Sequence, residues 1–167
     1  AELNEQAYLQ VIRSKTAKLF EASARVGAIL ADAPAEIEDA CADYGQALGT
    51  AFQVIDDVLD YTGNAEVLGK NLGDDLREGK TTLPLIAAMQ RGSDSERNLI
   101  KRAIESGDAD LLEDVVRIVR DTGALEITRD AARSEAVRAI AAVERLPKSP
   151  YSACMVDLAS DLLRRQV

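Results

Sequence analysis

The chain has 167 residues, a formal net charge of −9 and a hydrophobic content of 47%, with aromatic residues at only 4%. This length and apolar content suffice for a domain with its own hydrophobic core, and they argue against a disordered chain. The acidic balance argues against nonspecific nucleic-acid binding, which needs a basic face to neutralise phosphates.

The first half of the chain is expected to form two long helices. Apolar residues at three- and four-residue steps predict one helix over residues 4–30, with Asn4 as its cap. Pro34 can begin a helix but cannot continue one, so a second helix is expected over residues 35–61. Gly45 and Gly49 lie four residues apart in this second helix. Glycine is costly in a helix interior, so this pair indicates close packing against another helix.

Residues 62–82 hold four glycines and no helical period, so we expect an irregular segment there. Further helices are predicted over residues 84–90, 93–107, 109–121 and 125–145, and a last one from Ser149 onward. No strand pattern of useful length is present, so the fold class is all-α. No apolar run has the length of a membrane span, and no secretory signal pattern opens the chain, so we expect no transmembrane segment.

The segment GKNLGDDLREGKTT, residues 69–82, ends like a nucleotide-binding P-loop but does not fit one. A P-loop has four residues between its two glycines, whereas five separate Gly73 from Gly79, and three of these five are acidic. No strand is predicted before it. An EF-hand starting at Asp60 fails as well, because its obligatory glycine would fall at Ala65. Lys70 and Lys80 can therefore meet phosphate only in some other way.

An acidic face is predicted at the end of the second helix, in FQVIDDVLDY, residues 52–61. At about 100° per residue, Gln53, Asp56, Asp57 and Asp60 share one side of this helix. Carboxylates four residues apart repel one another, and the negative end of the helix dipole adds to the cost. A bound cation would relieve both effects. The chain has no histidine and no CxxC pair, so zinc is excluded and a hard oxygen-bound ion such as Mg²⁺ is favoured, together with a phosphate-bearing substrate.

The ordered motifs resemble those of the all-trans polyprenyl diphosphate synthase family, of the octaprenyl diphosphate synthase type. FQVIDDVLD followed by GKNLGDDLREGKTTLPL is similar to the family's second aspartate-rich region, and VIRSKTAKLFEAS, residues 11–23, is similar to its Lys-Thr helix. The family's first aspartate-rich motif and its isopentenyl diphosphate site have no counterpart here. The resemblance implies an isoprenoid synthase helical bundle, of which residues 1–167 are either a single helical domain or the C-terminal half.

The resemblance also implies a role for each matching residue. Metal binding falls to Asp56, Asp57, Asp60 and Asp75, of which Asp75 supports the water shell of Mg²⁺. Contact with the allylic diphosphate falls to Lys15, Lys70 and Lys80. Thr16 and Gln53 are placed near the reacting carbons. The implied reaction elongates an allylic diphosphate with isopentenyl diphosphate. The implied setting is a cytoplasmic homodimer that makes a ubiquinone side chain.

Three alternatives stay open. A terpene synthase or cyclase on the same fold also ionises a prenyl diphosphate with Mg²⁺, but its second metal motif usually follows an Asn/Ser/Glu pattern rather than DDxxD. The chain could also be a non-catalytic subunit of a heteromeric prenyl synthase. An interaction bundle without any ligand is the weakest interpretation. If the chain is one half of the enzyme, we expect it to be inactive by itself.

Overall fold

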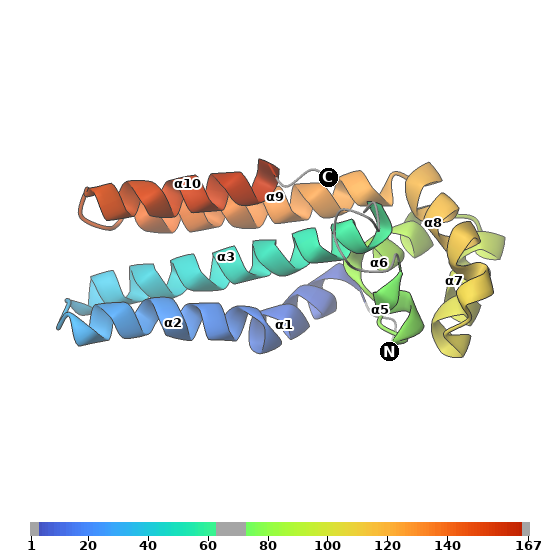
Figure 1. Ribbon diagram of the computed structural model, residues 1–167, viewed down its shortest axis with the longest axis horizontal. Coiled ribbons are helices and arrows are strands. Elements are labelled where there is room, and N and C mark those ends of the chain that lie inside the picture. Colours follow the sequence, from blue (N-terminus) through green and yellow to red (C-terminus); the bar gives the residue numbers. More distant parts are fainter. Residues whose placement is uncertain (1–3, 63–72, 165–167) are drawn as a thin grey trace. The chain divides into compact units, whose positions relative to one another are not determined.

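The computed structural model describes residues 4–62 and 73–164, and every regular element in those two ranges is helical (Figure 1). In chain order the elements are α1 (Glu5–Lys15), α2 (Ala17–Leu30), α3 (Ala35–Thr62), α5 (Asp74–Arg77), α6 (Leu83–Arg91), α7 (Asp94–Ser106), the 3-10 helix η1 (Ala109–Leu111), α8 (Leu112–Asp121), α9 (Ala124–Val143) and α10 (Pro150–Arg164). The all-α prediction is therefore confirmed.

Local capping explains several of these boundaries. Ser93 begins α7 with a full capping box, because its hydroxyl accepts from the backbone N–H of Glu96 while the Glu96 carboxylate accepts from the Ser93 N–H. Gly107 and Gly123 follow α7 and α8 with φ of 61° and 71°, a left-handed conformation that glycine adopts at little cost. The hydroxyl of Ser149 accepts from the N–H of Ser152 and so caps α10. These boundaries were predicted from the same residues.

The prediction of one helix over residues 4–30 was wrong in one respect. The structure has two helices there, α1 and α2, and Thr16 lies between them. The N–H of Leu19 bonds the carbonyl of Thr16 at 3.2 Å, three residues back, which is the tighter 3-10 pattern. The Thr16 hydroxyl meanwhile bonds a side chain of another helix. That tertiary contact could not be read from local periodicity.

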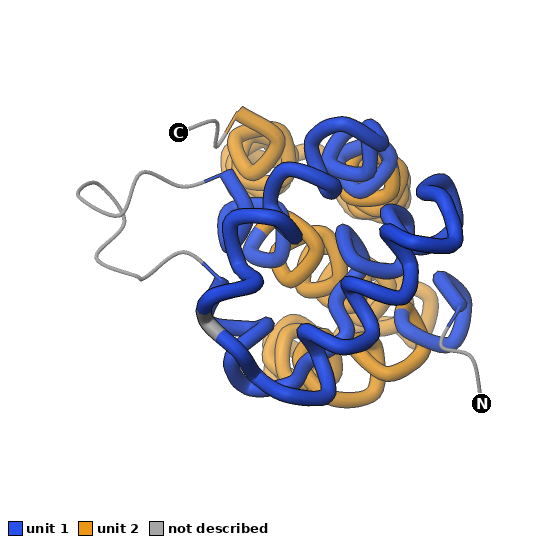
Figure 2. Tube along the Cα trace, turned by 90° about the vertical axis from the view of Figure 1, so that its right-hand side faces the viewer, with its two compact units in different colours: residues 1–8, 56–130, 167 blue, residues 9–55, 131–166 orange. Residues whose placement is uncertain are grey.

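The chain divides into two compact units (Figure 2). Unit 1 consists of residues 1–8, 56–130 and 167, and unit 2 of residues 9–55 and 131–166. The apolar core of unit 1 lies among α6, α7, α8 and the end of α3. Its fully buried members include Tyr61, Leu76, Leu85, Ile100, Val115 and Val119.

In unit 2, α2 and α3 approach so closely that side chains are excluded at two glycines. A Cβ atom at Gly45 would lie 2.4 Å from the carbonyl oxygen of Phe20, and one at Gly49 would lie 2.8 Å from the Cα atom of Ala17. Backbone atoms cannot move aside cheaply, so only glycine fits at these positions. The prediction that the pair marks tight helix packing is confirmed.

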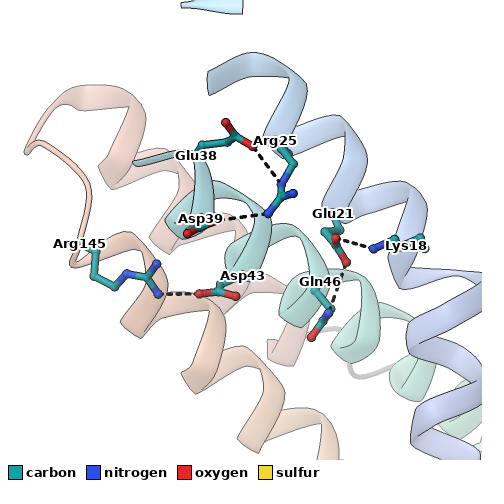
Figure 3. Close-up of polar contacts among 8 residues, drawn as sticks. All are labelled: Lys18, Glu21, Arg25, Glu38, Asp39, Asp43, Gln46 and Arg145. Atoms are coloured by element: carbon teal, nitrogen blue, oxygen red, sulfur yellow. Dashed lines mark hydrogen bonds and ion pairs between the residues drawn. The ribbon is translucent and has the colours of Figure 1, made fainter. Parts of the chain in front are cut away.

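Ion pairs of unit 2 join α3 to α2 and to Arg145, which follows α9 (Figure 3). The Arg25 guanidinium reaches Glu38 at 3.6 Å and Asp39 at 3.2 Å. Asp43 pairs with Arg145 at 2.6 Å. Arg25 and Glu38 are partly buried, and Asp39, Asp43 and Arg145 are exposed. Solvent therefore screens these pairs, and each contributes little stability. Within the described ranges, no helix combines the length and the apolar character needed to cross a membrane.

Candidate functional site

The acidic face of α3 lies in the part of this helix that belongs to unit 1, from residue 56 onward. Asp56, Asp57 and Asp60 occupy its last two turns, as the helical period predicted. Their environments differ, because Asp57 is fully buried whereas Asp56 and Asp60 are partly exposed. Three carboxylates that look equivalent in the sequence therefore have unequal access to a ligand.

Asp57 is held by a tyrosine of α1. The Tyr8 hydroxyl donates to Oδ2 of Asp57, and both side chains are buried. Burial raises the pKa of Tyr8 above its ordinary value, and the negative charge of Asp57 raises it further. The tyrosine therefore stays protonated and remains a donor to this carboxylate.

Asp60 organises the start of α5. Its two carboxylate oxygens accept the backbone N–H groups of Asp74 and Asp75, each at 3.2 Å. Its carbonyl also accepts from Gly73 at 3.0 Å. Burial, and then the negative charge of Asp75, raise the pKa of Asp60 to about 6, although the two N–H groups act in the opposite direction. Deprotonated Asp60 is thus held near Asp75 at an electrostatic cost, which a cation would offset.

Gly73 allows this approach of α5 to the end of α3. It has φ of 76°, and a Cβ atom there would lie 2.2 Å from Cδ1 of Leu112 in α8. A side chain at this position would meet both a strained backbone and an occupied space. The glycine is therefore required by the turn that carries Asp75 next to Asp60.

Lys80 already pairs with acidic side chains. Its ammonium lies 2.9 Å from Oδ1 of Asp75 and 2.7 Å from Oε2 of Glu78. These hydrogen bonds, first to Glu78 and then to Asp75, raise the pKa of Lys80. The lysine is exposed and fully charged, so it can exchange these partners for a phosphate oxygen. Lys70 lies outside the described residues.

The donor chemistry of this face fits a hard divalent cation. The charged groups of this face are carboxylates. Mg²⁺ is typically held by one or two carboxylates, and water and substrate phosphates complete its coordination shell. Within residues 4–62 and 73–164, no three or more acidic, cysteine or histidine side chains converge to hold an ion without such help. The arrangement thus suits an ion that arrives with a phosphate ligand.

The remaining predicted residues lie in unit 2. The Thr16 hydroxyl, at the break between α1 and α2, donates to Oε1 of Gln53 in α3 at 3.1 Å. Lys15 ends α1 and is exposed. The structure therefore joins Thr16 to Gln53, a contact that the spacing of the sequence did not indicate.

Sequence reasoning missed Tyr8. It lies seven residues before Lys15, which places both on the same side of α1 after two helical turns. That period could have drawn attention to Tyr8. It could not have identified Asp57 as the partner, because the two residues are 49 positions apart.

Comparison with known proteins defines the class. The model of the polyprenyl synthetase family matches residues 1–121, and the chain belongs to that family. The match covers the acidic face of α3 and the segment that carries Asp75 and Lys80. The resemblance noted from the sequence motifs is therefore confirmed.

Particular relatives agree with this assignment. The chain is 48% identical over 165 residues to octaprenyl diphosphate synthase of Escherichia coli, covering 98% of this chain and 51% of that protein. It is 46% identical over 164 residues to an all-trans-nonaprenyl-diphosphate synthase of Rhodobacter capsulatus, of which it covers 50%. A crystal structure of Caulobacter crescentus polyprenyl synthase, complexed with calcium and isoprenyl diphosphate, superposes with a TM-score of 0.92 at 38% identity, over 99% of this chain and 51% of that one. The chain thus spans about half the length of the relatives it matches.

Proposed function

We propose that the chain forms the diphosphate-binding and Mg²⁺-binding half of a trans-polyprenyl diphosphate synthase. The observation that carries the proposal is the acidic face of α3, which adjoins the α5 turn in a chain of the polyprenyl synthetase family. The proposed reaction is prenyl transfer, in which isopentenyl diphosphate elongates an allylic diphosphate. By family resemblance, the whole protein would act as a cytoplasmic homodimer in the synthesis of a ubiquinone side chain.

The metal-binding residues in this proposal are Asp56 and Asp60, supported by Asp75 and with Asp57 beside them. Bound there, Mg²⁺ would supply positive charge against the negative charge that develops on the departing diphosphate. The raised pKa of Asp60 supports this assignment, because a nearby cation would favour the charged form of a carboxylate that burial and the charge of Asp75 disfavour.

The lysines and the polar pair of unit 2 have separate roles in the proposal. Lys15, Lys70 and Lys80 bind diphosphate oxygens and stabilise the leaving group as the allylic C–O bond breaks and its electron pair passes to oxygen. The double bond of isopentenyl diphosphate then forms a new C–C bond with the allylic cation. Loss of a proton restores a double bond. In this proposal, Thr16 and Gln53 direct oxygen dipoles at the developing cation. The hydrogen bond between them holds both side chains in place.

A hybrid enzyme tests the proposal. Residues 1–167 replace the matching half of the E. coli octaprenyl relative, and the hybrid is incubated with farnesyl diphosphate, labelled isopentenyl diphosphate and Mg²⁺. We expect elongated labelled products, and we expect none from the 167-residue chain alone. Cyclised hydrocarbon products would instead support a terpene synthase, and a folded hybrid without any product would contradict the proposal.

The alternative of a subunit of a heteromeric prenyl synthase makes a different prediction. In that case the separately produced other half of the E. coli relative would gain activity when it is mixed with this chain. The carboxylates of α3 favour a catalytic contribution in either assembly. Their burial and mutual repulsion disfavour the folded chain, and a purely structural subunit would gain nothing in return.

A further inference from the structure

We propose that Tyr8 is a positioning residue for the metal-binding face of α3, and that it acts through Asp57. This inference rests on the proposed function, because it concerns the same carboxylates. It goes further because it assigns the carboxylates two different roles. Asp57 supports the site and is held by Tyr8, while Asp56 and Asp60 face the metal ion.

Burial separates the three carboxylates into these two groups. Asp57 has an exposed fraction of 0% and Tyr8 one of 7%, so their hydrogen bond lies in the interior of unit 1. A buried carboxylate is costly unless it is hydrogen-bonded. The Tyr8 hydroxyl supplies such a bond, and Asp56 and Asp60 keep access to solvent.

The bond also fixes the orientation of the helix. Asp57 adjoins Asp56 and precedes Asp60 by three residues, so a side chain that is anchored at Asp57 limits rotation of this last part of α3. Asp60 is anchored separately by the N–H groups at the start of α5. With both anchors in place, the partly exposed carboxylate oxygens keep one arrangement before an ion arrives, which lowers the entropic cost of binding.

Tyr8→Phe is the informative change, because it removes one oxygen atom and keeps the ring. The matched control is Tyr44→Phe in unit 2. Tyr44 is also buried, with an exposed fraction of 5%, and its hydroxyl donates to the carbonyl of Met155 at 3.0 Å. The control loses the same group from a similar environment without touching the acidic face.

The measurement is Mn²⁺ binding to the 167-residue chain in the presence of a fixed concentration of inorganic diphosphate, with protein-bound Mn²⁺ followed by its electron paramagnetic resonance signal. We expect Tyr8→Phe to raise the dissociation constant on the order of tenfold, the lower end of the loss that is typical when a residue supporting a metal site is removed. Tyr44→Phe should change it less than about twofold, even if both variants melt at the same lowered temperature. A merely structural tyrosine would lower the melting temperature without this difference in Mn²⁺ binding.

A double-mutant cycle tests whether Tyr8 acts through Asp57. In an Asp57→Ala background, the additional Tyr8→Phe change should alter Mn²⁺ binding less than about twofold. An unchanged tenfold effect in that background overturns the proposal, and so does equal Mn²⁺ binding by wild type and Tyr8→Phe.

Asp56→Ala separates this proposal from the proposed function. If wild type binds Mn²⁺ and Asp56→Ala does not, the metal role stands, and the Tyr8 comparison decides the positioning role alone. If wild type and Asp56→Ala bind equally, or neither binds, the metal role of α3 fails, and the role of Tyr8 fails with it.

Discussion

The two ends of helix α3 use polar and small residues in opposite ways. In unit 2 its first part packs tightly through Gly45 and Gly49, and its charged groups form exposed pairs such as the one between Asp39 and Arg25. In unit 1 its last two turns draw carboxylates into partly or fully buried positions. An exposed charge remains solvated, so its ion pairs contribute little free energy, whereas a buried charge is costly unless hydrogen bonds or an opposite charge compensate it. The second arrangement reduces stability unless a ligand is bound, which is the pattern expected where a helix serves a function.

The largest expected effect concerns the carboxylate that the proposal assigns most directly to the metal. In the hybrid enzyme, Asp56→Ala should lower kcat/KM for elongation by at least about a hundredfold, because neutralisation of the leaving group contributes several kcal/mol. The control is Asp39→Ala, an exposed aspartate of the same helix, which should leave elongation within about twofold. Steady-state assays with labelled isopentenyl diphosphate check both. Near-normal turnover in Asp56→Ala would remove Asp56 from the metal site.

The next effect is on stability and lies at the other end of α3. Gly45→Ala should destabilise the chain by about 2–3 kcal/mol, because the new methyl group would overlap the backbone carbonyl of Phe20. Gly27→Ala in α2 is the matched control, since nothing lies within 4 Å of the position that its Cβ atom would take. Alanine should stabilise α2 there by about 0.5–1 kcal/mol. Urea unfolding followed by circular dichroism measures both, and equal shifts would contradict the close approach of the helices.

The third effect is a pH dependence that arises from Asp60. Its pKa is raised from 3.8 to about 6 in the folded chain, so the folded state favours the protonated acid. The stabilisation is complete below about pH 4 and is lost as the pH rises through about 6. After allowance for the partial exposure of this carboxylate, the loss is about 1–2 kcal/mol.

Asp60→Asn isolates this contribution. The free energy of unfolding of the wild type, relative to this variant, should fall between pH 4 and pH 7 when Mg²⁺ is absent. Denaturant titrations at several pH values give the comparison. A difference that is constant over that interval would show that Asp60 titrates in its ordinary range and that burial does not strain the acidic face.

The smallest effect is expected at the surface pairs of unit 2. Arg25→Ala removes the contacts with Glu38 and Asp39 and should cost less than about 1 kcal/mol, because Asp39 is exposed and Arg25 and Glu38 are only partly buried. The cost should decrease further at high salt. Thermal melts at low and high ionic strength measure it. A salt-independent loss above about 2 kcal/mol would mean that the first part of α3 depends on charges after all, and would remove the contrast between its two ends.

Much of the architecture was predictable because its causes are local. Pro34, the Ser93 capping box and the glycines after α7 and α8 define helix ends through neighbouring residues, and the structure places those ends as predicted. The interruption at Thr16 was not predictable, since it accompanies a hydrogen bond to Gln53, 37 positions away. The short helix α5 was missed for a similar reason, because Asp60 of α3 accepts the N–H groups at its start.

The sequence by itself determined most of the helices, the line of carboxylates along one side of α3 and, through its motifs, the polyprenyl synthetase family. These features follow from a helical period and from short spacings, which are properties of neighbouring residues. Only the tertiary structure decided that Asp57 would be buried and bonded to Tyr8 while Asp56 and Asp60 stayed accessible, and that Asp60 would accept the N–H groups at the start of α5. Burial and hydrogen-bond partners depend on which distant segments meet, and the order of residues along one helix does not specify this.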